Sequence, residues 1–203
     1  HQITNVVIKH QANSLLILNE IHKELEQENI FVVNEKELTK SQKEFVKDYY
    51  HQKISPALVS IILQKNVELP VLKDKVAYLA VKMKMRLYNQ VIYSLIEIPR
   101  SLDRFIVLPK KEGKDYIILI DDVIRYCLDD IYQLFDFTSI SAHMIKITRD
   151  GELDFDTDLS KSFLAKISES VKDRRIGQPV RFVYDQNIDN DTINFLLKKM
   201  KVS

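Results

Sequence analysis

Apolar positions along the chain predict one long helix followed by a mixture of strands and helices. Residues 2–28 carry apolar side chains at roughly helical spacing, at Ile3, Val7, Ile17, Ile21 and Leu25. This pattern is typical of an amphipathic helix, whose apolar stripe needs partner helices. We expect this helix to be either an arm packed on the rest of the chain or one helix of a helical domain cut away upstream.

Runs rich in β-branched and aromatic residues predict strands at 30–33, 76–85, 90–98, 104–109, 116–120, 143–148 and 179–184. A short turn near Tyr88 and Asn89 joins two of these runs and predicts an antiparallel hairpin. Gly113 and the charges around it indicate an exposed loop at 110–115. Residues 54–63 could form either a strand or a loop, because Pro56 cannot donate a hydrogen bond to a neighbouring strand.

Capping signals and helical spacing predict further helices. Thr39 and Gln42 form a capping box that opens a helix through about His51. Helical spacing of apolar residues also predicts one helix from Ile120 to Phe135, through Val123, Ile124, Cys127, Leu128, Ile131 and Leu134. Two more helices are expected at 158–175 and 190–201. The pattern indicates the α+β class, with a mixed, largely antiparallel sheet, packed helices and one long helix before them.

Composition narrows the range of functions. The 203 residues are 45% apolar and 29% charged, typical of a globular protein with one full domain and an accessory piece. A net charge of +1 argues against wholesale binding to nucleic acid or an anionic membrane, but allows a local basic patch. The single Cys127 excludes an internal disulfide. Without a long apolar run or signal-peptide pattern, we expect a cytoplasmic protein, and the initial His1 suggests a piece of a longer one.

The stretch "KITRDGELDFDTD" combines a basic strand with five acids, Asp150, Glu152, Asp154, Asp156 and Asp158. An EF-hand loop counted from Asp150 fails, because Phe155 and Lys161 occupy the positions of the required Gly and Glu. We favour Asp156 or Asp158 as the cap of a helix beginning near Leu159. A calcium or magnesium site on this run is the alternative.

The segment "IDDVIRYCLDDIY" places Arg125 between two Asp pairs. On a continuous helix, Arg125 lies four residues from both Asp121 and Asp129 and can bridge them. The apolar stripe lies on the opposite side. We therefore expect a solvated or partner-facing charged face, with Cys127 on the stripe as a buried, inert thiol.

Five basic residues form the candidate anion-binding set: Lys146, Arg149, Arg181, Arg174 and Arg175. Arg149 has the strand parity of the apolar Ile145 and Ile147, whereas Lys146 points the other way. Phosphate binding through such side chains competes with salt pairing to the many Asp residues and, at a helix C-terminus, with stabilisation of the dipole. The five His residues match no metal-binding or catalytic spacing and there is no phosphate-binding Gly loop, so we assign no catalytic or metal residue.

Several strings in a fixed order resemble the middle, or head, domain of the bacterial-type polyphosphate kinase. They are "ENIFVVNEKEL", "AYLAVKM", "IEIP…RFIVLP", "ILIDDVIRYCLDDIY", "MIKITRDGELD" and "PVRFVYDQN". The resemblance runs from about Glu28 to the end of the chain. It implies a head domain at 29–203, preceded at 1–28 by the last helix of the family's helical N-terminal domain.

The resemblance also implies a function for the parent protein. That family moves the terminal phosphate of ATP reversibly onto polyphosphate, with Mg²⁺ and through a phosphorylated histidine in downstream domains that this chain lacks. None of the five His residues matches those motifs, so the implied role is a non-catalytic piece that supplies homodimer contacts and part of the polyphosphate channel. Lys146, Arg149 and Arg181 lie in matching strings, and Arg174 and Arg175 in a less distinctive one.

The resemblance leaves two matters open. The parent is implied to bind polyphosphate and ATP or ADP, without nucleic acid or a transmembrane segment, as a cytoplasmic enzyme with membrane association as an alternative. The rival hypothesis is a freestanding protein–protein interaction module that uses the first helix and the charged helix face.

Overall fold

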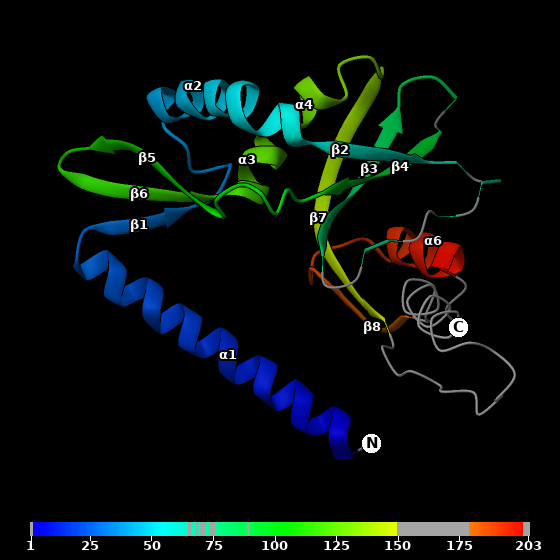
Figure 1. Cartoon of the computed structure of the whole chain (residues 1–203), viewed down its shortest axis with the longest axis horizontal. Helices are drawn as coiled ribbons and strands as arrows, with labels where there is room; N and C mark the ends of the chain where they lie inside the picture. Colours follow the sequence, from blue (N-terminus) through cyan, green and yellow to red (C-terminus); the bar gives the residue numbers. More distant parts are fainter. Residues whose placement is uncertain are drawn as a thin grey trace, which may run out of the picture. The chain divides into compact units, whose positions relative to one another are not determined.

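A computed structural model describes residues 2–64, 66–67, 69, 72–73, 76–88, 90–149 and 179–200. The chain divides into two compact units, each built from separate stretches of sequence (Figure 1). Unit 1 comprises His1–Pro56 and Ser101–Cys127, and unit 2 comprises Ala57–Arg100 and Leu128–Ser203. Helices and mainly antiparallel strands occur in both, which confirms the α+β class.

Unit 1 contains a three-stranded sheet in the order β1–β6–β5. β1 (Ile30–Val33) pairs in parallel with β6 (Lys114–Leu119), and β5 (Phe105–Lys111) pairs with β6 in the antiparallel sense. The β5–β6 connection is a two-residue turn in which Glu112 and Gly113 have φ of 54° and 76°. Positive φ at both positions is the signature of a type I′ hairpin, so the predicted loop is shorter than expected.

Helices cover one face of this sheet. α2 (Lys40–Tyr49) packs on β5, and α3 (Ile120–Tyr126) packs on β6 (Figure 1). The capping box of Thr39 and Gln42 is present as predicted. α2 continues into a π-helical turn, η1 (Tyr50–Ile54), and a 3₁₀ turn, η2 (Ser55–Ala57). The buried side chains of β5 and β6 on this face are Ile106, Leu108 and Ile118.

The predicted single helix from Ile120 to Phe135 is wrong. α3 ends at Tyr126, Cys127 has non-helical dihedrals, and α4 (Leu128–Ile131) is a separate short helix. The break coincides with the passage of the chain from unit 1 to unit 2. The helical spacing of apolar residues continues across the break because α3 and α4 each bury apolar side chains. Leu134, which lies beyond both helices, is 95% exposed.

Unit 2 contains a five-stranded antiparallel sheet in the order β2–β4–β3–β7–β8. The strands are β2 (Val59–Leu63), β3 (Ala77–Met85), β4 (Val91–Glu97), β7 (Phe137–Arg149) and β8 (Pro179–Tyr184). The predicted β3–β4 hairpin is confirmed, and the ambiguous segment 54–63 ends in β2. β7 begins six residues before the predicted strand, because "FTSISA" pairs with β3 despite its polar side chains.

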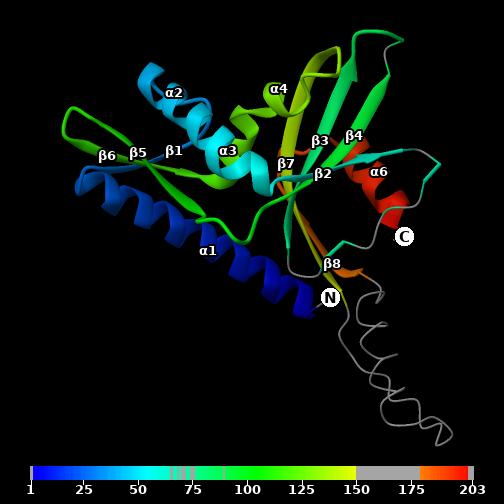
Figure 2. The ribbon, with the colours of Figure 1, turned by 45° about the horizontal axis from the view of Figure 1, so that its top comes forward.

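α6 (Asn190–Met200) covers one face of the five-stranded sheet (Figure 2). Its Leu196 joins a core formed by strand residues that include Tyr78, Ala80, Leu95, Ile145 and Ile147. Phe195 stacks on Tyr93 with ring centroids 4.2 Å apart. This packing leaves the opposite face of β7 and β8 for other contacts.

α1 (Gln2–Gln27) confirms the predicted long N-terminal helix. Every residue from Val6 to Ile21 is exposed, and no other helix of unit 1 runs alongside (Figures 1 and 2). The exposed apolar residues are Val6, Val7, Ile8, Leu15, Leu16, Ile17, Leu18 and Ile21. Among the helices of the described residues, none has the length and apolarity needed to span a membrane.

Candidate anion-binding face

The pairing of β7 with β8 brings two of the predicted basic residues to one face of the sheet. Lys146 lies opposite Val183, and Thr148 lies opposite Arg181. Paired residues point to the same side, and residues two apart on a strand share a face. Lys146 and Arg181 are therefore diagonal neighbours, with backbones roughly 7–8 Å apart.

Both basic side chains are exposed, whereas their strand neighbours are buried on the other face. Ile145 and Ile147 are 1% and 0% exposed and belong to the core under α6. Lys146 and Arg181 are exposed, and Thr148 beside them is half-buried. The predicted orientation of Lys146, away from Ile145 and Ile147, is confirmed. We call Lys146, Thr148, Arg181 and Val183 the β7–β8 face.

This face has the chemistry of an anion-binding surface. An ammonium and a guanidinium offer charge-assisted donors to phosphate oxygens, and Arg can do so with two parallel hydrogen bonds. Thr148 lies directly opposite Arg181 and two residues from Lys146, and its hydroxyl can also donate. The chemistry of this face suits the binding and orientation of an anion rather than its chemical conversion, because none of its four described residues is placed beside a partner that would make it a nucleophile or general base.

The other predicted positions lie at or beyond the edge of the described residues. The backbone of Arg149 ends β7, opposite Pro179, after a register shift that follows Thr148. The side chain of Arg149 lies outside the described residues. So do Arg174 and Arg175, the acidic run 150–158 with its proposed metal site, and the helix expected at 158–175.

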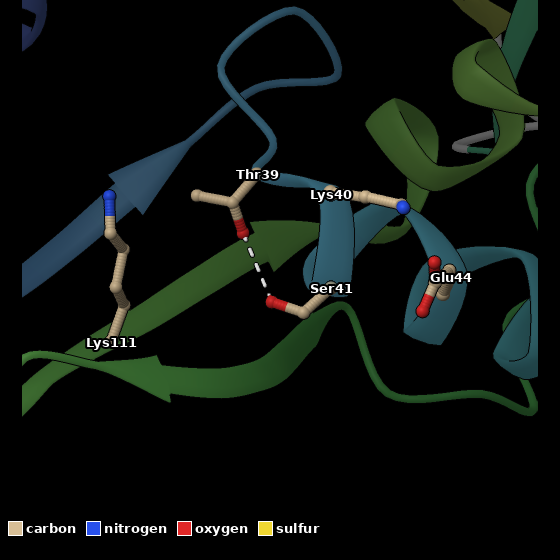
Figure 3. A pocket seen from close by; sticks show the side chains of 5 residues that line it. All are labelled: Thr39, Lys40, Ser41, Glu44 and Lys111. Carbon is tan, nitrogen blue, oxygen red and sulfur yellow. Dashed lines mark hydrogen bonds between the residues drawn. The ribbon is translucent and has the colours of Figure 1, made fainter.

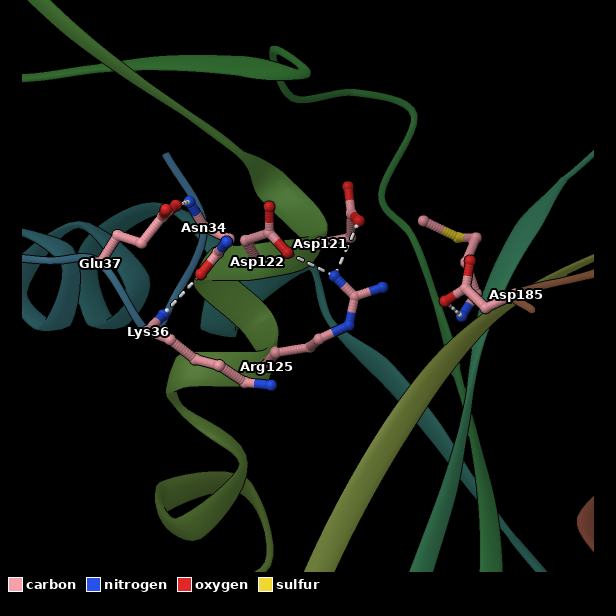
Figure 4. Close-up of polar contacts among 8 residues, drawn as sticks. Asn34, Lys36, Glu37, Asp121, Asp122, Arg125 and Asp185 are labelled. Atoms are coloured by element: carbon pink, nitrogen blue, oxygen red, sulfur yellow. Dashed lines mark hydrogen bonds and ion pairs between the residues drawn. The ribbon is translucent and has the colours of Figure 1, made fainter. Parts of the chain in front are cut away.

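The predicted solvated face of α3 is wrong. Asp121 and Asp122 are only 6% and 9% exposed. Arg125 donates to both, with Nη1 3.0 Å from Asp121 Oδ2 and 2.5 Å from Asp122 Oδ1 (Figure 4). Because the helix breaks at Cys127, Arg125 and Asp129 do not share a continuous helix. Cys127 is buried, as predicted.

Burial has a strong effect on one of these carboxyls. It raises the pKa of Asp122 to about 7, with the neighbouring charge of Asp121 acting in the same direction. Arg125 acts in the opposite direction, and Glu35 raises the pKa further through its charge and a hydrogen bond. The sequence contains no local signal for this cluster, because Glu35 is far from α3 along the chain.

A second charged contact that sequence reasoning missed joins β3 to the start of α6. The Nζ of Lys82 lies 2.9 Å from Asp189 Oδ2 and 2.5 Å from Asp191 Oδ2, and its side chain is 9% exposed. Burial lowers the pKa of Lys82, but its bonds to Asp191 and Asp189 outweigh that effect and leave the pKa raised. The bond to Lys82 lowers the pKa of Asp191. The sequence signal that could have revealed this contact is a lysine, Lys82, within the otherwise apolar string "AYLAVKM".

A surface hollow of about 500 Å³ lies between the start of α2 and the end of β5 (Figure 3). Its lining comes from Thr39, Lys40, Ser41, Glu44 and Lys111. The Thr39 hydroxyl caps α2 through Gln42 N, so the helix start is already partly satisfied. The hollow is open to solvent and is a weaker candidate than the β7–β8 face. Within the described parts of the chain, no group of three His, Cys, Asp or Glu residues is placed to hold a metal.

Comparison with known proteins identifies relatives along most of the chain. A family model described as the polyphosphate kinase middle domain matches residues 41–203. The polyphosphate kinase of Vibrio cholerae serotype O1 is 38% identical over 192 residues, which cover 92% of this chain and 27% of that protein. The polyphosphate kinase of Escherichia coli K12 is 33% identical over 192 residues, or 92% of this chain and 28% of that protein. The chain thus spans less than a third of the length of these curated relatives.

A solved structure shows the same fold. The crystal structure of polyphosphate kinase from Porphyromonas gingivalis has a TM-score of 0.73 to this chain, with 20% sequence identity. The similarity covers 98% of this chain and 28% of that one. Because the family model matches far more than half of its residues, this chain belongs to the polyphosphate kinase family and contains the family's middle domain.

Proposed function

We propose that this chain forms part of the wall of a polyphosphate channel in a polyphosphate kinase that transfers the terminal phosphate of ATP reversibly onto polyphosphate. The observation that carries the proposal is the exposed pair of Lys146 and Arg181 on the β7–β8 face. Membership of the family supports polyphosphate as the anion. The phosphohistidine chemistry and its Mg²⁺ belong to other parts of the parent enzyme, so the chain alone makes no polyphosphate from ATP.

The geometry of the β7–β8 face suits a repeating anion. Polyphosphate presents one negative charge or more per unit and no base-like pattern, so binding depends on placed cations more than on shape. Lys146 and Arg181 sit roughly 7–8 Å apart at the backbone, and their long side chains can contact neighbouring phosphates. We include Arg149, Arg174 and Arg175 in the proposed channel lining on the sequence alone, because their side chains lie outside the described residues.

Binding by charge-reduced variants tests the proposal. We expect Lys146→Ala and Arg181→Ala each to weaken polyphosphate binding about two- to fivefold, the range for an exposed ionic contact. Each should also reduce the salt dependence of binding. Lys84→Ala is the matched control, because Lys84 is an exposed strand lysine on the opposite face of the same sheet. Equal losses in the three variants would contradict the proposal.

A second candidate function is protein–protein docking. Phe105 and Val107 of β5 are 61% and 64% exposed, on the face of the three-stranded sheet opposite Ile106 and Leu108. Exposed apolar surface of this kind is typical of interaction sites. We propose that this sheet face contacts a second copy in the homodimer, and that α1 packs among helices of an N-terminal domain of the parent.

Sedimentation of the 203-residue chain tests the dimer contact. Val107→Lys places a charge in the proposed contact and should weaken self-association at least tenfold. Val59→Lys is the control, because Val59 is a similarly exposed strand valine in unit 2. A chain that stays monomeric at all concentrations, or a Val107→Lys variant that associates normally, would rule out this contact without affecting the channel proposal.

A further inference from the structure

Strand β5 forms one edge of the three-stranded sheet (Figure 1). Ile120 N donates to Arg104 O at 2.9 Å, so these two residues are a hydrogen-bonded pair that continues the antiparallel β5–β6 register. Hydrogen-bonded pairs alternate along an antiparallel ladder, so every second residue of β5 up to Leu108 directs its N–H and C=O groups toward β6. The N–H and C=O groups of Phe105 and Val107 therefore point to the outer side of β5.

The outer side of β5 is open where these groups lie. Within the described part of the chain, no hydrogen bond satisfies the outward groups of Phe105 and Val107. The two residues are 61% and 64% exposed. Farther along the strand, Gln42 Nε2 donates to Pro109 O at 3.4 Å, so α2 contacts that end of the edge. The open part of the edge is therefore short and centred on Ile106.

This part of the edge lacks the features that commonly keep edge strands from pairing. Natural edge strands are often blunted by charged residues, by Pro or by a bulge. In β5 these features begin only at Pro109, with the lysines and the register shift that follow Leu108. The residues from Phe105 to Leu108 are all apolar. An unblunted apolar edge of this kind favours pairing with another strand.

The open edge is complementary to a second copy of itself. Two β5 strands can lie antiparallel with Phe105 of each copy opposite Val107 of the other, about a two-fold axis at Ile106. Residues in a hydrogen-bonded antiparallel pair exchange both of their bonds, so every outward N–H and C=O of Phe105 and Val107 would find a partner. The same register sets an aromatic side chain beside a β-branched one on the exposed face, which is a favourable cross-strand pair.

We propose that two copies of this chain join through their β5 edges, in antiparallel register about Ile106, so that their two three-stranded sheets become one continuous sheet. The inference rests on the homodimer proposed above and specifies how its contact is made. A second copy is the fitting occupant because the same strand supplies both the outward backbone groups and the apolar side chains at matching positions. Interfaces of standard size bury about 800 Å² per partner, and the open edge is smaller, so we expect a weak, reversible dimer.

Amide hydrogen exchange of the 203-residue chain at low and high protein concentration tests the pairing. At the concentration where sedimentation shows the dimer, we expect the amides of Phe105 and Val107 to exchange about tenfold more slowly than in the monomer, because they become hydrogen-bonded. Ile106 is the internal reference, since its amide already bonds to β6 in the monomer. Its exchange rate should change much less.

A proline substitution separates the backbone contact from side-chain packing. Val107→Pro removes an N–H that the isolated chain does not use, so its stability in urea should change little. The dissociation constant of the dimer should rise about tenfold or more, because a backbone hydrogen bond is lost on both sides of the axis. Val107→Ala is the matched control, because it shortens the side chain and keeps the N–H. It should weaken the dimer less than Val107→Pro and retain the protection of Phe105.

The outcomes distinguish this contact from the homodimer itself. A dimer in which Phe105 and Val107 exchange at the monomer rate would overturn the edge pairing and leave the homodimer in place. If Val107→Pro fails to fold, the exchange rates of the unsubstituted chain decide the case. A chain that stays monomeric, with both amides unprotected, would overturn both proposals and would assign this edge to a strand from elsewhere.

Discussion

At the scale of single residues, we expect the contact of Lys82 with two carboxylates to stabilise unit 2. Asp189 and Asp191 hold a lysine that is 9% exposed, at the point where α6 begins. We expect the double variant Asp189→Asn, Asp191→Asn to lower the free energy of unfolding by about 1–3 kcal/mol, because it leaves a buried ammonium without charged partners. Urea titration measures this loss.

An exposed pair provides the comparison. Arg86 Nε lies 2.9 Å from Asp136 Oδ1, and both side chains are more than 60% exposed. Asp136→Asn should cost less than about 1 kcal/mol, since exposed ion pairs contribute little. A loss as large as that of the double variant would mean that burial of Lys82 does not matter.

Asp122 gives the chain a specific pH dependence of stability. Its pKa is raised from 3.8 to about 7, so the folded state binds more protons than the unfolded state between these values. The free energy of unfolding should therefore fall as pH rises from about 4 to about 7, by at most about 1.4 kcal/mol per pH unit. Asp122→Asn should remove this component, whereas Asp129→Asn should retain it. A wild-type component that rises with pH over this range would contradict the assignment.

At the scale of elements, the β5–β6 turn carries strain that a substitution can relieve. Glu112 has φ of 54° at the first position of a type I′ turn, which Asn and Gly occupy at lower cost. Its ion pair with Lys111, at 3.9 Å between exposed side chains, contributes little. Glu112→Asn should raise the free energy of unfolding by about 0.5–1 kcal/mol. Glu112→Ala is the control and should give no gain, because Ala also disfavours positive φ.

The sheet face on which a strand residue lies could be predicted from the sequence, because side chains alternate between the two faces of a strand. Lys146 was placed opposite Ile145 and Ile147 on that rule alone, and the structure agrees. Arg181 could join it only once the β7–β8 register was known, since register depends on pairing between segments distant in sequence.

Helix α3 shows what the sequence could not reveal. Its apolar spacing continues into α4, although the chain passes between units at Cys127. The same helical projection assigned Asp121 and Asp122 to solvent, but they are buried beside Glu35. Periodicity describes one helix at a time, whereas the burial of these acids depends on tertiary packing, which the spacing within one helix does not give.

At the scale of the whole molecule, the chain contains the middle domain of the polyphosphate kinase family. The two relatives described above are more than three times as long as this chain. Its proposed contribution is to bind and orient polyphosphate rather than to transfer phosphate. Purified chain incubated with ATP and Mg²⁺ should therefore synthesise no polyphosphate above a heat-denatured control. Detectable synthesis would show that the chain contains a phosphoryl-transfer site that its five His residues and described side chains do not suggest.

The most direct test of the central claim is residue-by-residue NMR of the chain during titration with polyphosphate. The account predicts that the largest shifts occur at Lys146, Thr148 and Arg181, with Lys84 on the opposite face unchanged. Increasing salt should reverse these shifts, because the contacts are ionic. Absence of shifts at Lys146 and Arg181, or shifts of equal size at Lys84, would contradict the assignment of the β7–β8 face to the polyphosphate channel.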